Sequence, residues 1–436
     1  MRLRNILDID LSLFLSSLLL ACFGILFIYS SGISSARTLA STEYIRQIVW
    51  AVSGMLIALV ISMLDYRRIY DLSAYIYLAI LLLLVYTVFF GRMVSGARAW
   101  IGIGGFGIQP SEFAKIATIL ALARYLDSTR HEQNEFKRFA VSSALVFIPM
   151  GIILLQPDFG TALVFIPILL TMTFIAGLSL RYVFFMTACI ILSGLLMVLP
   201  LWHIHILRGA FPSLMILTNI RFILLGGIFL VTVFAIALYG FLRFRKRYFY
   251  WIVYTSAVLL LSLGASFVGG KMLQDYQIMR LIVFLDPNVD PRGSGWNIIQ
   301  SITAIGSGGV LGKGYLQGTQ SHYRFLPQQS TDFIFSIFSE EWGLVGGLLV
   351  FALFLIILLR LVRITRTTSD PFGSYIASGF AAMVAFHFIV NVGMTMGIMP
   401  ITGIPLLFMS YGGSALISAM TGIGLSLSIY SRRFQH

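Results

Sequence analysis

The chain has 436 residues, of which 58% are hydrophobic and only 11% charged, and its formal net charge is +13. Soluble domains are about 45–50% apolar and about 25% charged. This composition excludes a water-soluble fold, because there is too little polar surface to cover the apolar side chains. The positive charge does not indicate a nucleic-acid-binding protein, since the basic residues stand in short clusters between apolar runs. Cys22 and Cys189 both lie inside apolar runs, so no disulfide framework is expected.

The apolar runs predict membrane-spanning helices. A helix needs roughly 20 apolar residues to cross the hydrocarbon core. A shorter run at 111–125 carries Glu112 and Lys115, and it counts as a span because the loops on its two sides differ in charge. The predicted spans are 11–31, 45–64, 72–90, 111–125, 139–155, 161–178, 182–202, 222–242, 250–267, 342–359, 374–392 and 405–430. We therefore expect an all-α, polytopic membrane helix bundle with about twelve transmembrane helices.

Every second loop between these spans is basic. The basic residues are Arg2, Arg4, Arg67, Arg68, Arg130, Lys137, Arg138, Arg181, Arg243, Arg245, Lys246, Arg247, Arg363, Arg366, Arg432 and Arg433. Cytoplasmic loops carry the excess of Lys and Arg. The alternation therefore predicts that both termini are cytoplasmic.

The stretch 268–330 is the long segment on the opposite, extracytoplasmic side. Loops of this length are usually either functional or disordered. Its turn-forming clusters (DPNVDPRGSG, GSGGVLGKG) and its aromatic residues favour an ordered element, with a short interfacial helix at 296–305. We expect this structured loop to be part of a single membrane domain that spans 1–436.

Glu112 and Lys115 are charged residues inside a predicted span. An ionisable group at membrane depth is costly and marks a candidate functional site. At a spacing of three the two side chains share a helical face and can neutralise each other. They can form an ion pair that only fixes packing, or a functional pair. Arg98 and Trp100 in the preceding loop favour the functional interpretation.

The loop segment FLDPNVDPRGSGWNIIQS contains Asp286 and Asp290. An aspartate before proline is often only a turn former. Asp290 also precedes a glycine-rich bend and an amphipathic stretch that ends in Gln300 and Ser301, where a carboxylate could meet a substrate at headgroup level. Both interpretations of Asp290 stay open from the residues alone.

Two other patterns give weaker evidence of a functional site. The run AIGSGGVLGKG is not a P-loop, because Ser307 and Gly314 occupy positions that require glycine and Ser or Thr. Lys313 in that run still suits contact with a phosphate, since its ammonium is compact. The histidines have no metal-binding spacing, and no Ser-His-Asp or Cys-His arrangement can be assembled.

Four long runs together resemble the SEDS proteins (shape, elongation, division and sporulation), and more closely their elongation branch than their division branch. The runs are GARAWIGIGGFGIQPSEFAKIA, QPDFGTALVF, FLDPNVDPRGSGWNIIQSITAIGSGGVLGKGYLQGTQSHYRFLPQQSTDFIFSIFSEEWG and NVGMTMGIMPITGIPLLFMSYGGSALI. Family members usually have ten spans. The segment 203–267 therefore looks like an inserted helix pair, which preserves the side on which the loop lies.

The resemblance implies a peptidoglycan glycosyltransferase of the bacterial cytoplasmic (inner) membrane. Such enzymes polymerise lipid II, an undecaprenyl diphosphate disaccharide-pentapeptide, on the outer face of that membrane during cell elongation. Asp290 matches the family's essential loop aspartate and would be the general base for the acceptor 4-hydroxyl. The expected substrate-binding residues are Arg98, Trp100, Glu112, Lys115, Arg280, Ser301, Lys313, Gln320, Asp332 and Glu340.

The family works in a complex with a class B penicillin-binding protein, so that transpeptidase and other elongation-complex proteins are the expected partners. No protein metal site is expected, although a divalent cation (Mg²⁺ or Mn²⁺) could assist at the diphosphate. Two alternatives stay open. The chain could be a lipid II flippase, because ionisable residues in a bundle also suit transport, or a scaffold that recruits a penicillin-binding protein.

Overall fold

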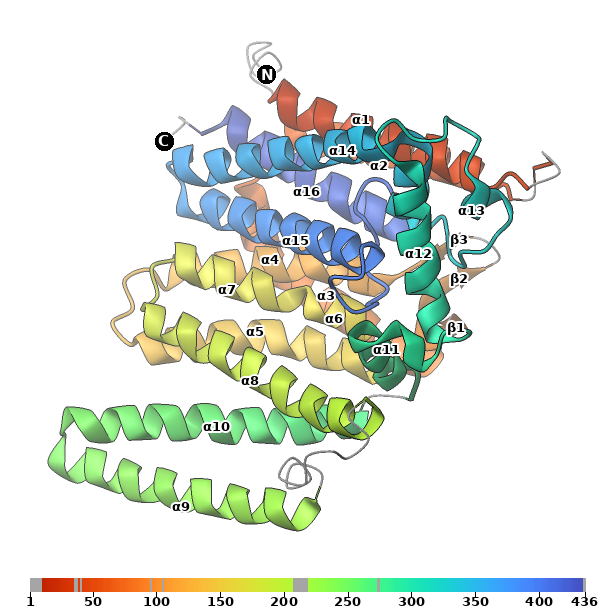
Figure 1. The fold of residues 1–436 in the computed structure, drawn as a ribbon. Coiled ribbons are helices and arrows are strands. Elements are labelled where there is room, and N and C mark those ends of the chain that lie inside the picture. The colour runs from red at the N-terminus through yellow and green to blue at the C-terminus, as the bar shows by residue number, and fades with distance from the viewer. Residues whose placement is uncertain are drawn as a thin grey trace. The chain divides into compact units, whose positions relative to one another are not determined.

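The computed structural model describes residues 10–34, 38–39, 41–94, 96–103, 106–206, 219–272 and 275–433. The chain divides into two compact units: Met1–Leu178 with Asn297–His436, and Ser179–Trp296. Helices dominate both units (Figure 1), which confirms the predicted membrane helix bundle.

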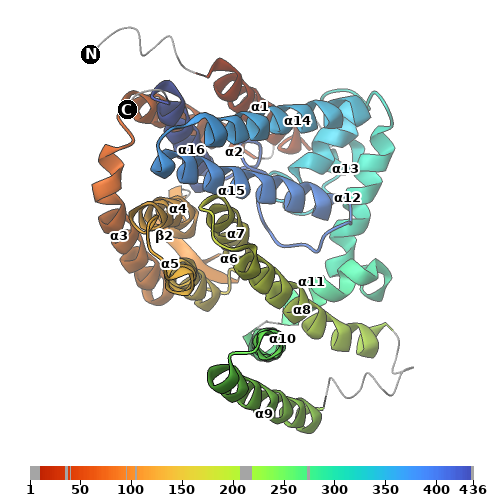
Figure 2. The ribbon, with the colours of Figure 1, turned by 90° about the vertical axis from the view of Figure 1, so that its left-hand side faces the viewer.

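The first unit holds most of the helices. They are α1 (Leu11–Ser31), α2 (Glu43–Met63), α3 (Arg68–Phe90), α4 (Pro110–Ser128), α5 (Glu135–Leu155), α6 (Phe159–Leu163), α7 (Phe165–Ile175), most of α12 (Ser294–Gly308), α13 (Thr319–His322), α14 (Ile334–Thr367), α15 (Pro371–Thr395) and α16 (Gly413–Ser431). Helices α15 and α16 are the most buried of the candidate spans. Helix α15 packs against α14, α7 and α4, and α16 packs along α2 (Figures 1 and 2).

Small residues allow α16 to approach its neighbours closely. A Cβ atom added to Gly424 would lie 2.7 Å from the Ala58 carbonyl oxygen of α2. Helix packing in membranes depends on such small residues, because lipid supplies no hydrophobic force between helices. The buried hydroxyl of Ser426 donates to the Gly422 carbonyl of its own helix, so it adds no unsatisfied polar group.

A small sheet, which the sequence did not predict, precedes α4. Strands β1 (Arg92–Val94), β2 (Ala97–Ile103) and β3 (Phe106–Ile108) form an antiparallel sheet in the order β1-β2-β3. Gly96 has a φ of 87° in the turn between the first two strands, a conformation that glycine adopts without strain. The sheet leads directly into Pro110, the first residue of α4.

The second unit contains α8 (Leu180–His205), α9 (Ile220–Phe244), α10 (Arg247–Met272), α11 (Asp275–Leu285) and the 3₁₀ turn η3 (Pro287–Val289). Helix α10 packs against both α8 and α9. Helices α9 and α10 occupy the two spans predicted at 222–242 and 250–267. Their origin as an inserted pair stays a prediction.

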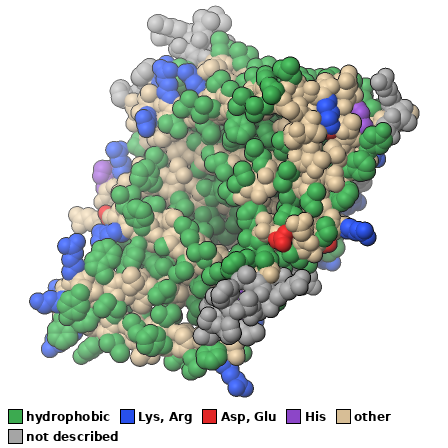
Figure 3. Space-filling view, viewed as in Figure 1, with side chains coloured by type: hydrophobic (Ala, Val, Ile, Leu, Met, Phe, Trp, Pro, Cys, Tyr) green, Lys and Arg blue, Asp and Glu red, His purple; other side chains and the backbone are tan. Residues whose placement is uncertain are grey.

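Among the described residues, ten helices are long and apolar enough to cross a membrane: α1, α2, α3, α5, α8, α9, α10, α14, α15 and α16. The twelve-span count is therefore not confirmed. The helix α4 matches the span predicted at 111–125, but it is not among the ten. On the face drawn in Figure 3, hydrophobic side chains predominate, as expected for a multi-pass membrane protein.

The span predicted at 161–178 contains α6 and α7, which meet at Val164, a residue with helical φ and ψ. Pro167 in the first turn of α7 cannot donate to residue 163, which accounts for the interruption. One span boundary was wrong. The span predicted from residue 405 begins only at Gly413, since Phe408 has a φ of 70° and Gly412 also leaves the helical region.

The stretch 268–330 contains α11, η3, α12 and α13, and α12 covers the helix predicted at 296–305. The long loop is therefore structured over its described residues. Its extracytoplasmic location stays a prediction.

Close packing at Gly24 gives a test of this arrangement. A Cβ atom added there would lie 2.7 Å from Met409 Cα, in the segment before α16. We expect Gly24→Ala to lower the melting temperature of the purified protein, because overpacking typically costs about 1–3 kcal/mol. The matched control is Gly151→Ala in α5, where the added Cβ meets nothing within 4 Å. Equal melting temperatures for the two variants would contradict the packing.

Candidate active site

Glu112 and Lys115 form a buried ion pair on α4. Lys115 Nζ lies 2.8 Å from both carboxylate oxygens of Glu112. Lys115 is 0% exposed and Glu112 is 2% exposed. The Glu112 carbonyl accepts a hydrogen bond of 2.8 Å from the Ser418 hydroxyl of α16. The predicted pairing is therefore confirmed, while its part in substrate binding stays a prediction.

His387 on α15 completes this cluster, and sequence reasoning missed it. Its Nε2 lies 3.1 Å from Lys115 Nζ, and its Nδ1 lies 2.9 Å from the Pro405 carbonyl oxygen. Because a carbonyl only accepts, Nδ1 carries the proton and Nε2 accepts from the lysine. His387 and Lys115 are 272 positions apart, so no local spacing could have indicated the contact.

Asp158 lies near the same pair, in the turn before α6. Its Oδ1 accepts from the Thr161 N–H and its Oδ2 from the Gln109 side chain. Burial raises the pKa of the Asp158 carboxyl, and the Glu112 carboxylate acts in the same direction. The backbone N–H of Gln109 also donates to the Ser414 hydroxyl oxygen, which connects this turn to α16.

Glu340 near the start of α14 accepts several hydrogen bonds from the end of the long loop. Its Oε1 accepts from Lys313 Nζ at 2.7 Å and from the backbone N–H groups of Thr319 and Gln320 at 2.8 and 2.9 Å. The glutamate is fully buried, whereas the Lys313 side chain is 26% exposed. Lys313, Gln320 and Glu340, all of which were predicted to bind substrate, therefore meet in one cluster.

The adjacent Glu341 was not predicted. It accepts from the Ser30 hydroxyl of α1 and from the Leu316 N–H at 3.0 Å. Two residues later α14 bends at Gly343, whose φ is 63°, and the N–H of Leu344 donates to Gly309. The bend is thus fastened to the glycine-rich run of the loop, which explains that run without a phosphate-binding function.

Asp290 lies between η3 and α12, in a turn closed by its own hydrogen bonds. Its Oδ1 accepts from the Gly293 N–H at 3.0 Å, and its carbonyl accepts from Gly295. A Cβ atom at Gly293 would collide with the Asp290 carboxylate as it is placed here, so a larger residue there would displace that side chain. Asp286 instead caps η3 and accepts from the N–H and side chain of Asn288.

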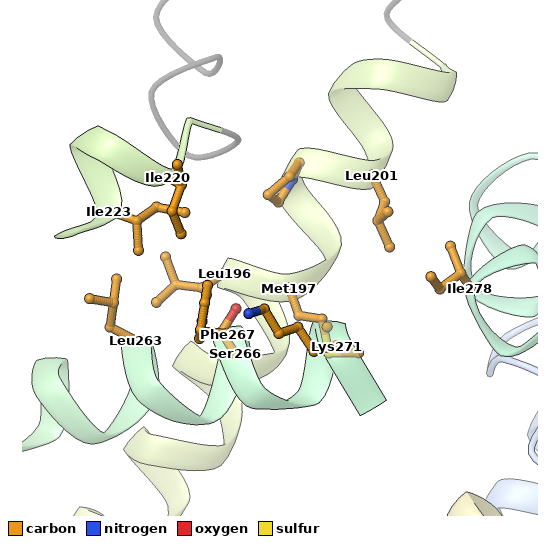
Figure 4. Close-up of a pocket in the computed structure, with 12 residues that line it drawn as sticks. Leu196, Met197, Leu201, Ile220, Ile223, Leu263, Ser266, Phe267, Lys271 and Ile278 are labelled. Atoms are coloured by element: carbon orange, nitrogen blue, oxygen red, sulfur yellow. The ribbon is translucent and has the colours of Figure 1, made fainter. Parts of the chain in front are cut away.

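Arg280 precedes this turn on α11, with its guanidinium 5.4 Å from the centre of the Tyr276 ring. The same unit contains an apolar pocket of about 300 Å³ (Figure 4), lined by Leu196, Met197, Pro200, Leu201, Ile220, Ile223, Leu263, Ser266, Phe267, Gly270, Lys271 and Ile278. Lys271 is the cationic residue of that lining, and its ammonium lies 4.4 Å from the centre of the Phe267 ring.

The remaining predicted residues lie in the first unit. Arg98 is exposed on β2, and the Trp100 ring packs over Gly107 of β3, where an added Cβ would lie 2.9 Å from the ring. Ser301 is fully buried, with its hydroxyl 2.6 Å from Ser336 Oγ and from the Thr395 carbonyl. The Asp332 carbonyl accepts from Asn391.

The predicted residues thus fall into groups. Glu112 with Lys115, and Lys313 with Gln320 and Glu340, are in contact. Asp290 and Arg280 belong to the second unit. In the described ranges, no three His, Cys, Asp or Glu side chains gather in a group that could hold a metal ion.

Comparisons with known proteins extend over nearly the whole chain. The family model for FtsW, RodA and SpoVE, described as a cell cycle protein, matches residues 10–210 and 225–434. Peptidoglycan glycosyltransferase RodA of Treponema pallidum is 52% identical over 433 residues, which cover 99% of this chain and all of the relative. Peptidoglycan glycosyltransferase MrdB of Escherichia coli is 32% identical over 98% of this chain and 94% of its own length.

Solved structures agree with the fold. A chain from a peptidoglycan synthase complex, studied for the coordination of polymerization and crosslinking, is 28% identical and has a TM-score of 0.69, with 98% of this chain and 99% of that chain covered. The crystal structure of Thermus thermophilus RodA, at 24% identity, has a TM-score of 0.60 over 98% of each chain. The chain therefore belongs to the FtsW, RodA and SpoVE family of cell cycle proteins, the SEDS family that its motifs indicated.

Proposed function

We propose that this protein is a peptidoglycan glycosyltransferase that joins lipid II units into glycan at the outer face of the bacterial inner membrane. The observation that carries the proposal is the end-to-end identity of 52% with a relative named peptidoglycan glycosyltransferase RodA. A lipid-linked donor needs an enzyme that is embedded in the bilayer, which fits the ten apolar helices of the described chain. The proposed orientation places both termini in the cytoplasm.

Asp290 is the proposed general base. The acceptor's 4-hydroxyl attacks the anomeric carbon of the donor sugar and transfers its proton to the carboxylate, while undecaprenyl diphosphate leaves with the electrons of the broken C–O bond. A well-placed base contributes about 10²–10⁴-fold to such a step. The Asp290 turn supports the role because hydrogen bonds from Gly293 and Gly295 hold this residue in place.

The departing diphosphate needs positive charge around it, since stabilising charge that develops in the transition state is usually the largest catalytic contribution. Arg280 is a suitable donor because α11 leads directly into the Asp290 turn of the same unit. Arg98, exposed on β2 of the other unit, stays a predicted substrate-binding residue. Lys313 is already bonded to Glu340. We assign it to holding the loop, and it would contact a phosphate only in addition to that bond.

A transpeptidase partner follows from the same assignment. A structural relative belongs to a complex that coordinates polymerization and crosslinking, and we propose that this chain works with a class B penicillin-binding protein in the same way. A divalent cation (Mg²⁺ or Mn²⁺) at the diphosphate stays an expectation, and no step is assigned to it.

Replacement of the proposed base gives the most direct test of the reaction. We expect Asp290→Asn to lower the rate of lipid II polymerisation by about 10²–10⁴-fold, because asparagine can still accept from Gly293 but cannot take a proton at neutral pH. The assay uses the purified complex and labelled lipid II in detergent, where there are no two membrane sides and flipping cannot be scored.

Asp286→Asn is the matched control, since Asp286 also accepts backbone and side-chain N–H groups four residues earlier. It should polymerise at the wild-type rate. Glycan synthesis by Asp290→Asn at the wild-type rate would eliminate this base. If the wild-type complex makes no glycan in detergent, the flippase alternative gains support instead.

The buried pair needs a test that separates stability from activity. We expect Lys115→Met to destabilise the protein by about 3–5 kcal/mol, because it leaves the Glu112 carboxylate buried without its partner. The double variant Glu112→Leu with Lys115→Met should regain thermal stability and yet remain inactive in polymerisation. Recovery of activity together with stability would show that the pair only fixes packing.

A further inference from the structure

The ammonium of Lys115 has all three of its protons engaged inside the protein. Two are directed at the Glu112 carboxylate, at 2.8 Å from each oxygen, and the third is directed at His387 Nε2 at 3.1 Å. A lysine ammonium has three donors and no acceptor. Since the residue is 0% exposed, this arrangement leaves no proton of Lys115 for a substrate phosphate.

His387 can accept a hydrogen bond from the third N–H of Lys115 in only one neutral tautomer. Its Nδ1 must carry a hydrogen to bond the Pro405 carbonyl at 2.9 Å, which leaves a lone pair on Nε2 for the lysine. The ring is 1% exposed, so water does not replace either contact. The imidazole therefore connects the ion pair of α4 to the irregular segment that precedes α16.

We propose that His387 is a positioning residue for the transferase reaction, which holds Lys115 and through it the Glu112 carboxylate in a single arrangement. The inference rests on the proposed function, and it changes the expected role of Lys115. The lysine acts through a fixed charge and position and does not bind the diphosphate directly. A lost acceptor would leave the third N–H of Lys115 unpaired, so the ion pair would no longer be fixed in one position, and small displacements in a catalytic site can cost about 100-fold in rate.

Two substitutions separate the two bonds of the imidazole. His387→Gln places a side-chain oxygen near the position of Nε2, so it can still accept from Lys115. His387→Asn places an amide near Nδ1, so it can still donate to Pro405 but cannot reach the lysine. We expect the glutamine variant to keep kcat within about threefold of wild type and the asparagine variant to lose about 10- to 100-fold.

KM for lipid II should change little in either variant, because Lys115 makes no bond to the diphosphate before the reaction. Ser378→Ala is the control for removal of a buried polar group from α15, since that hydroxyl donates only to Tyr375 of its own helix. Melting temperatures of all variants show how far each substitution destabilises the fold. If the losses of kcat follow the melting temperature, or if asparagine is active and glutamine is not, the positioning role is wrong.

A spectroscopic measurement decides the inference even if the wild-type complex makes no glycan. In the full chain labelled with ¹⁵N-histidine, the resonances that disappear in His387→Gln belong to this ring. We expect a neutral ring protonated at Nδ1, with an Nε2 resonance that shifts in Lys115→Met. A ring protonated at Nε2 overturns the proposal. So does an Nε2 resonance with the same chemical shift in wild type and in Lys115→Met. Failure of glycan synthesis alone would count against the proposed function and not against this contact.

Discussion

A charge that is buried in a membrane protein must have a partner within hydrogen-bond distance, because lipid and apolar side chains offer it none. The first unit is arranged around such a group, the Lys115 ammonium of α4. Glu112 supplies the opposite charge one turn away, and His387 supplies the remaining acceptor from α15. Helix α4 can therefore be buried among α3, α5, α7, α15 and α16 although it is less apolar than the other spans.

The other buried carboxylates follow the same rule but serve the long loop. Glu340 and Glu341 near the start of α14 accept hydrogen bonds. The donors are the ammonium of Lys313, hydroxyl and backbone N–H groups of residues 313–321, and the Ser30 hydroxyl. These bonds order a glycine-rich segment that has little apolar side-chain area of its own. Asp290 differs in being only partly buried, and its carboxylate accepts a hydrogen bond from the Gly293 N–H of its own turn. The proposed role as general base requires that accessibility.

The sequence predicted the features that depend on local pattern. The lengths of the apolar runs predicted the positions of the long helices, and the spacing of Glu112 and Lys115 predicted their ion pair. The sheet at 92–108 was missed because its strands are short and glycine-rich. The contact of His387 with Lys115 depends on how α4 and α15 pack, and no periodicity encodes that. Ser301 was predicted to bind substrate because of the motif in which it lies. In the structure its hydroxyl is instead buried between helices, where it contacts Ser336 and the Thr395 carbonyl.

The central claim is that Asp290 takes the proton of the acceptor sugar. The measurement that tests it most directly is a cryo-EM structure of the Asp290→Asn complex with lipid II bound. The account predicts a sugar 4-hydroxyl within about 2.6–3.2 Å of the residue 290 side chain, with the lipid diphosphate near Arg280. A lipid-linked sugar seated away from residue 290, or a loop that faces the cytoplasm, would contradict it.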